Sequence, residues 1–123
     1  MIAYSSRTGN VRYIVKQLGL PYIEIDDGLI LEQPFLLFTY TDGLGEVPKV
    51  VESFLQRNSE FCKGVIASGN SNFGHAYFCK SADIIHRNFG IPIVRKIELR
   101  GFQKDYDKII QFYHEVIEKG IFV

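Results

Sequence analysis

Apolar residues follow two different spacings along this chain, and the spacing changes from one segment to the next. Short, nearly continuous apolar runs are typical of strands buried in a parallel sheet. The run FLLFTY at residues 35–40 predicts a central strand that is buried on both faces. Runs of this kind predict strands at residues 1–4, 21–25, 35–40, 63–68 and 91–99.

Between these runs, apolar residues recur three and four positions apart, as on the buried face of a helix. Helices are predicted at residues 11–18, from Pro48 onward, at 76–89 and at 105–119, and residues 28–33 stay irregular. Strands that alternate with helices predict an α/β fold, a doubly wound parallel sheet with helices on both faces. The length of 123 residues predicts a single domain, residues 1–123.

Composition narrows the classes of partner. The chain has 14 basic and 14 acidic residues and no basic stripe, so no nucleic-acid partner is expected. No apolar run reaches membrane-spanning length, and Met1 leads directly into the first strand without room for a signal peptide. A cytoplasmic protein without a membrane partner is expected. Cys62 and Cys79 are then expected to be buried, reduced thiols rather than a disulfide, and no metal site is predicted.

The stretch YSSRTGN, residues 4–10, connects the first predicted strand to the first predicted helix. Its hydroxyl and amide side chains admit two interpretations. They are residues that often cap helices, and they also suit an anion at the helix N-terminus, where Gly9 lets the backbone approach closely. A phosphate fits the second interpretation. The stretch contains neither a dinucleotide-binding G-x-G-x-x-G nor a Walker lysine.

Two further loops decide between these interpretations. The segments TYTDGLGEVP (39–48) and SGNSNFGHAYF (68–78) follow the third and fourth predicted strands and are rich in Gly, Asn, Ser and Thr. In a sheet of this kind, ligands bind at the carboxyl ends of the strands, where all three loops should meet. Agreement among three loops favours a ligand site over simple helix capping.

The second and third loops are suited to a planar heterocycle. Backbone groups around Asp42–Gly45 and at Gly69 and Asn70 could reach ring nitrogens and carbonyls, while aromatic side chains cover the ring faces. Phe73 is favoured for the site, whereas core packing is the favoured interpretation of Tyr40; both uses are open for Tyr77. A solvated helix cap is favoured for His75, and His86 and His114 are assigned no role.

The residues S-R-T-G-N (6–10), together with the two glycine-rich loops, resemble the flavodoxins, which bind flavin mononucleotide (FMN). This resemblance implies a flavodoxin-like five-stranded sheet in the order 2-1-3-4-5. The chain departs from the pattern at Val11, where a hydroxyl is common, and in having no Trp to cover the ring; Leu44 is expected near that position. The short chain and the stretch GNSNFG (69–74) are more specifically similar to the NrdI family, small flavodoxin-like partners of class Ib ribonucleotide reductase.

The NrdI resemblance implies a function. Reduced flavin would react with dioxygen to give superoxide or peroxide, which the small (beta) subunit of the reductase uses to assemble its dimanganese–tyrosyl radical cofactor. A flavin or flavodoxin reductase would supply electrons. The chemistry would lie on the flavin with no catalytic side chain, so an accessory redox protein rather than a stand-alone enzyme is expected. The implied FMN-binding residues are Ser5, Ser6, Arg7, Thr8, Gly9, Asn10, Val11, Tyr40, Thr41, Asp42, Gly43, Leu44, Gly45, Ser68, Gly69, Asn70, Asn72, Phe73, Gly74 and Tyr77.

Charge bears on the redox behaviour and on the alternatives. No acidic residue occurs between Cys62 and Ala82, so a fully reduced, anionic flavin is expected to be easier to reach than in an acidic flavodoxin. A general flavodoxin, which carries single electrons between a reductase and several acceptors, is the main alternative. A flavin-free module that binds a phosphorylated ligand is a second one. An oxidoreductase with its own substrate is least favoured, because the loops contain no evident acid–base pair.

Overall fold

Five parallel strands form one sheet in the computed structural model, which describes residues 1–120 of the chain. The order is β2-β1-β3-β4-β5, so the predicted fold class and strand order are confirmed. The predicted domain, residues 1–123, extends three residues beyond the described part. The strands are β1 (Ile2–Tyr4), β2 (Tyr22–Glu24), β3 (Phe35–Tyr40), β4 (Cys62–Gly69) and β5 (Ile93–Glu98).

The central position of β3 follows from its apolar sequence. Its first five residues are buried, and it pairs with β1 on one side and β4 on the other. An apolar run with no polar face is stable only where layers cover both sides of the sheet. The edges are β2 and β5, which are less buried and carry more polar residues.

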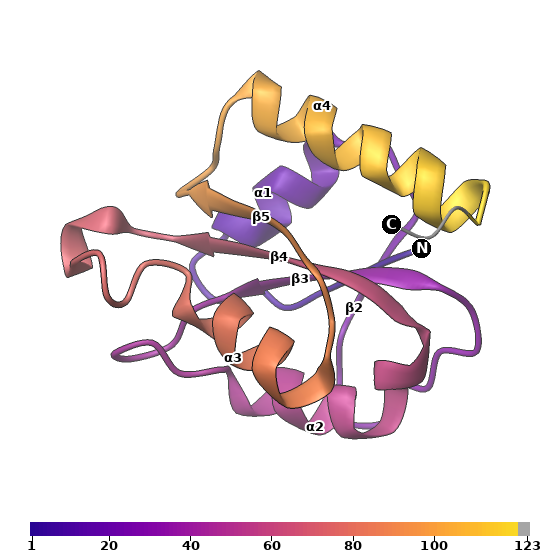
Figure 1. Cartoon of the computed structure of the whole chain (residues 1–123), viewed down its shortest axis with the longest axis horizontal. Helices are drawn as coiled ribbons and strands as arrows, with labels where there is room; N and C mark the ends of the chain where they lie inside the picture. The colour runs from indigo at the N-terminus through magenta and orange to yellow at the C-terminus, as the bar shows by residue number, and fades with distance from the viewer. Residues whose placement is uncertain (121–123) are drawn as a thin grey trace.

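Helices cover both faces of the sheet, as Figure 1 shows. On one face, α1 (Asn10–Gln17) and α4 (Gln103–Phe112) pack against the sheet, and the π-helical turn η3 (Tyr113–Glu118) continues α4. On the other face lie α2 (Lys49–Asn58) and α3 (Lys80–Phe89). The short 3-10 turns η1 (Ser59–Phe61) and η2 (Ser71–Phe73) flank β4. Each face thus has its own hydrophobic cluster, with the sheet between them.

The helix predicted to begin at residue 76 begins at Lys80, which corrects the sequence interpretation. Cys79 adopts a left-handed conformation with φ of 51°, and the amides of Tyr77 and Lys80 donate to carbonyls three residues earlier. A left-handed residue interrupts a right-handed helix. Residues 74–79 therefore belong to the loop that follows β4, which makes that loop longer than expected.

The last strand is also shorter than predicted, since it ends at Glu98 rather than at Leu99. Leu99 has a φ of 52°, the only other positive φ among the described residues that are not glycine. This conformation turns the chain out of the extended region at the strand's carboxyl end. The irregular stretch 28–33 is confirmed, and the buried Asn58 amide fixes it through hydrogen bonds with Leu29 and Leu31.

Both cysteines are free and buried, as predicted. Burial raises the pKa of the Cys62 thiol to about 12, and it raises that of Cys79 to about 12 as well. Both side chains therefore act as small apolar core residues rather than as nucleophiles. Within residues 1–120, no helix combines the length and apolar character needed to cross a membrane.

Candidate functional site

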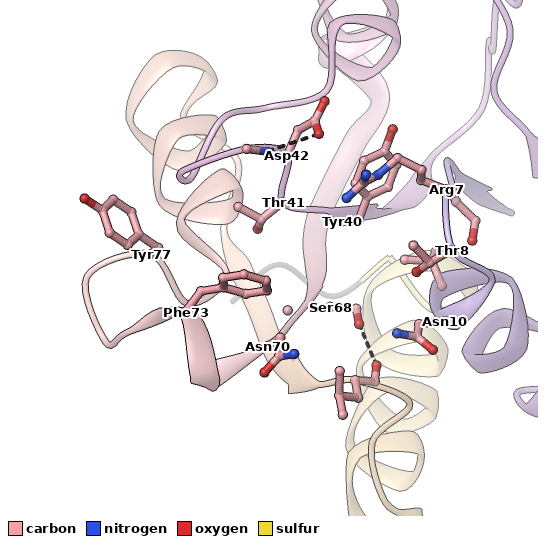
Figure 2. Close-up of a pocket in the computed structure, with 15 residues that line it drawn as sticks. Arg7, Thr8, Asn10, Tyr40, Thr41, Asp42, Ser68, Asn70, Phe73 and Tyr77 are labelled. Atoms are coloured by element: carbon pink, nitrogen blue, oxygen red, sulfur yellow. Dashed lines mark hydrogen bonds between the residues drawn. The ribbon is translucent and has the colours of Figure 1, made fainter.

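A cavity of about 600 Å³ opens at the carboxyl ends of β1, β3 and β4, where the three polar loops meet. In Figure 2, Arg7, Thr8 and Asn10 lie on one side of it, and Phe73, Asn70 and Tyr77 lie on the other. Every lining residue except Leu99 is among the predicted site residues. The lining consists of Ser6, Arg7, Thr8, Asn10, Val11, Tyr40, Thr41, Asp42, Gly43, Ser68, Gly69, Asn70, Phe73, Tyr77 and Leu99.

The first loop brings the N-terminus of α1, which is only partly capped, to this cavity. The cap residue of α1 is Gly9, whose φ of 96° favours glycine and which offers no side-chain acceptor. Ser6 Oγ accepts a hydrogen bond of 3.2 Å from the Arg12 amide. The amides of Asn10 and Val11 find no acceptor within residues 1–120. Helix capping therefore explains only part of the loop, and two backbone donors remain for an anion.

Two arginines add positive charge at this loop, Arg7 from within it and Arg100 from the segment after β5. The Arg7 guanidinium lies 5.4 Å from the centre of the Tyr40 ring, and that of Arg100 lies 4.5 Å from the Tyr13 ring. Arg100 Nε also donates to Asn10 Oδ1 at 3.2 Å. Their positive charges add to the helix dipole and favour a negatively charged group at this end of the cavity.

The second loop is held by its own backbone. Asp42 and Glu46 exchange two backbone hydrogen bonds of 2.8 and 2.7 Å, and the Gly43 amide donates to Asp42 Oδ1 at 3.1 Å. Thr41 Oγ1 forms a 2.8 Å hydrogen bond with Ser81 Oγ, which joins the loop to α3. The tip of this loop projects beyond the cavity and exposes Leu44.

The third loop carries the most exposed aromatic side chain of the site. Phe73 is 70% exposed, although it lines the cavity. The loop is shaped locally by Asn70 Oδ1, which accepts from the Asn72 amide at 2.9 Å. Gly69 at its start is required by close packing, because a Cβ there would lie 2.9 Å from Cys79 Sγ. An exposed aromatic ring facing a cavity is suited to packing on a ligand.

Six predicted site residues lie outside the lining of the cavity. Ser5 is buried at the end of β1, where its amide donates to Phe38 O, and Gly9 acts through the backbone as the cap of α1. The others occupy the loop tips. The six are Ser5, Gly9, Leu44, Gly45, Asn72 and Gly74. His75 is exposed and also lies outside the lining.

Sequence reasoning missed the contribution of β5. Leu99 lines the cavity, and both carboxylate oxygens of Glu98 accept from the Ser71 amide, at 3.2 and 3.1 Å. The third loop therefore has an acidic neighbour, although its own sequence contains none. No motif in the sequence signals this, because the contacts depend on the position of β5 beside β4.

The cavity combines a polar end and an apolar end. Its volume lies in the range that holds a ligand the size of a nucleotide cofactor. Free backbone donors with nearby arginines suit a phosphate, while Phe73 and Tyr77 suit a flat ring. The donor set thus fits a phosphorylated planar molecule.

Comparisons with known proteins agree with this geometry. A sequence model of the family described as "NrdI Flavodoxin like" matches residues 2–111. Protein NrdI from Bacillus licheniformis is 40% identical to this chain over 120 residues, which cover 97% of this chain and 91% of the relative.

Solved flavodoxins share the fold. A short-chain flavodoxin associated with a bacterial microcompartment superimposes with a TM-score of 0.67 at 18% identity, covering 97% of this chain and 96% of that one. A Fusobacterium nucleatum flavodoxin, solved bound to flavin mononucleotide, gives a TM-score of 0.57 at 16% identity, with 96% of each chain covered. These structures support the architecture, and the sequence match is more specific. The chain belongs to the NrdI flavodoxin-like family.

Proposed function

We propose that this protein binds FMN and uses it to activate the small subunit of a class Ib ribonucleotide reductase. The observation that carries the proposal is the meeting of free helix amides and an exposed aromatic ring at opposite ends of one cavity. Bound and reduced, FMN supplies electrons to dioxygen and yields superoxide or peroxide. The recipient is a dimanganese centre in the small subunit, beside which a tyrosyl radical forms.

The first loop binds the phosphate of FMN. The amides of Asn10 and Val11 donate to its oxygens, and the hydroxyl of Thr8 adds a side-chain donor. Val11 contributes no hydroxyl, so the backbone carries more of the binding here. Arg7 within the loop and Arg100 beside it lower the energy of the bound dianion.

The second and third loops hold the isoalloxazine ring. Phe73 and Tyr77 cover ring surface, which excludes water from that side, and backbone groups of Gly43 and Gly69 lie within the lining to meet the ring edge. The side chains thus position the isoalloxazine ring, and the flavin itself supplies the redox chemistry. The protein is an accessory redox protein by this proposal, with no nucleophile or acid–base pair of its own.

The proposed partners follow from the same family. The reductase small subunit receives the oxidant, and a flavin or flavodoxin reductase supplies electrons. The exposed side chains of Leu44 and Phe73 border the cavity, so this rim is the proposed region of contact. The cytoplasm is the proposed location, where both free thiols would stay reduced.

One observation favours a second candidate, a general one-electron carrier. Asp42 lines the cavity, and Glu98 contacts the third loop at Ser71. Carboxylates close to the ring disfavour an anionic reduced flavin, as in acidic flavodoxins. This offsets part of the expectation drawn from the acid-free sequence of the third loop.

The test begins with the purified protein and its flavin content, followed by an anaerobic reductive titration monitored by absorbance. Reduction with little one-electron-reduced flavin supports the activase, whereas a large and stable one-electron stage supports the general carrier. The reduced protein is then exposed to oxygen beside the manganese-loaded small subunit. Tyrosyl radical, measured by electron paramagnetic resonance, should exceed that obtained with free reduced FMN. Equal yields with and without the protein contradict activation.

A further inference from the structure

We propose that the residues at the end of β5, Glu98, Leu99 and Arg100, form a fourth part of the cofactor site. Leu99 contacts the flavin nucleotide, and its two neighbours hold the first and third loops in place. This inference rests on the proposed binding of FMN. It adds to the three loops a segment that follows the edge strand.

Leu99 is fixed at the wall of the cavity by two hydrogen bonds. Its carbonyl accepts from Ser68 Oγ at 2.5 Å, the dashed line from Ser68 in Figure 2, and its amide donates to Gly69 O at 2.8 Å. Both partners belong to the end of β4 and also line the cavity. The backbone of Leu99 is therefore tied directly to the site.

The conformation of Leu99 is unfavourable for its residue type. A leucine with φ of 52° is strained, because Cβ lies close to its own carbonyl oxygen in the left-handed region. Such residues persist where surrounding contacts hold them, and they cluster at functional sites. Here the two hydrogen bonds hold the strained turn, and Leu99 remains 43% exposed in the lining. An apolar ligand surface would cover it.

The neighbours of Leu99 connect the two ends of the cavity. Glu98 accepts both hydrogen bonds from the Ser71 amide, at the start of the turn that carries Phe73. Arg100 donates to Asn10 Oδ1 in the first loop, and its carbonyl accepts from the Tyr106 hydroxyl of α4. Glu98, Leu99 and Arg100 thus contact, in this order, the third loop, the wall of the cavity and the first loop. The segment therefore sets the distance between the first and third loops.

These roles predict that substitutions at Leu99 and at Arg100 change the affinities for FMN and for riboflavin differently. Riboflavin is the useful comparison because it is FMN without the phosphate. Loss of an apolar contact at Leu99 should weaken both ligands. Loss of the Arg100 hydrogen bond should weaken FMN alone, because Arg100 acts through the phosphate loop. Arg100 is in this sense a positioning residue, and Leu99 is a binding residue.

The test titrates flavin-free protein with FMN and with riboflavin, using the quenching of flavin fluorescence. Leu99→Ala should weaken both ligands about five- to tenfold, because most of a half-buried apolar side chain is removed. Arg100→Met should weaken FMN about fivefold and leave riboflavin within twofold, so the ratio of the two affinities falls. Phe102→Ala is the matched control, since Phe102 is an exposed apolar neighbour outside the lining. Thermal unfolding checks that each variant folds.

Unchanged FMN and riboflavin affinity in Leu99→Ala would overturn the inference while leaving the proposed function intact. So would an Arg100→Met variant that weakens both ligands equally, because that pattern indicates general loosening of the fold. If the wild-type protein binds neither ligand, the proposed function itself fails, and this inference fails with it.

Discussion

The two sides of the cavity differ in how far they are formed without a ligand. On the phosphate side, Ser6, Asn10 and Arg100 already engage in hydrogen bonds that fix the start of α1. On the ring side, hydrogen bonds fix the loop backbones, but Phe73 is left 70% exposed. One side is prepared for its ligand in advance, and the other leaves apolar surface to be covered on binding.

This difference indicates how the binding energy is divided between the phosphate side and the ring side. A preformed set of amides loses little conformational entropy on binding and recognises charge. An exposed aromatic ring contributes only when a ligand covers it, and it recognises shape and apolar surface. FMN and riboflavin therefore separate the two contributions, because they differ only in the phosphate.

The largest expected effect comes from placing a negative charge on the phosphate side. Thr8→Asp should weaken FMN about a hundredfold, since two like charges some 4 Å apart repel by about 4 kcal/mol before solvent screening at this exposed site. Riboflavin affinity should change by less than threefold. Thr8→Asn, which is similar in shape but neutral, is the control. A similar loss of both ligands in Thr8→Asp would place the phosphate elsewhere.

Removal of the exposed ring should have the next largest effect. Phe73→Ala should weaken FMN and riboflavin alike by about tenfold, in line with about 1–3 kcal/mol for stacking on an aromatic side chain. The free energy of unfolding of the flavin-free protein should stay unchanged, because the side chain has few contacts to lose. Phe102→Ala, with a similar exposed fraction of 68%, should leave both affinities intact. Isothermal titration calorimetry measures each affinity, and a loss confined to FMN would contradict the assignment of the ring side.

Salt concentration should have a smaller effect on ligand affinity, and the effect should be confined to the phosphate side. Raising the ionic strength from about 0.1 M to about 1 M shortens the Debye length from about 10 Å to about 3 Å. The affinity for FMN should fall about threefold, since the attraction of Arg7 and Arg100 for the phosphate is screened. Riboflavin should bind equally well at both salt concentrations. A parallel decrease for both ligands would mean that charge does not separate the two sides.

The smallest effect concerns the stability of the cavity wall. The free energy of unfolding of Leu99→Gly should be about 0.5–1 kcal/mol higher than that of Leu99→Ala. Glycine relieves the strain of the left-handed conformation, and this gain exceeds the entropic cost of ordering a glycine. Urea denaturation of the two flavin-free variants measures this difference. Neither variant should recover wild-type affinity for FMN. If alanine proves as stable as glycine, the turn at residue 99 is not strained.

The sequence predicted the elements and most of the cavity lining because both depend on local patterns. Buried strands and amphipathic helices follow from apolar spacing, and loops after parallel strands meet at one edge of a sheet by topology alone. The start of α3 was placed four residues early because the left-handed turn at Cys79 overrides an apolar pattern that continues through it.

The contacts of β5 could not be predicted for a different reason. Glu98 is 27 residues from Ser71, and Arg100 is 90 residues from Asn10, so no local pattern relates them. The absence of acidic residues from the third loop was correctly observed in the sequence. The carboxylate of Glu98, which a neighbouring strand places beside that loop, could not be found from sequence proximity.

The outer position of β5 has a consequence for association between copies of the chain. An edge strand offers unpaired backbone groups to another strand, and long apolar edges promote aggregation. On β5, Arg95 pairs with Asp105 of α4 at 2.6 Å, and Lys96 pairs with Asp83 of α3 at 2.8 Å. These ion pairs hold two cations on the edge strand, where a second strand would have to bury or displace them. The same strand that ends at the cofactor cavity is thereby protected from strand-to-strand aggregation.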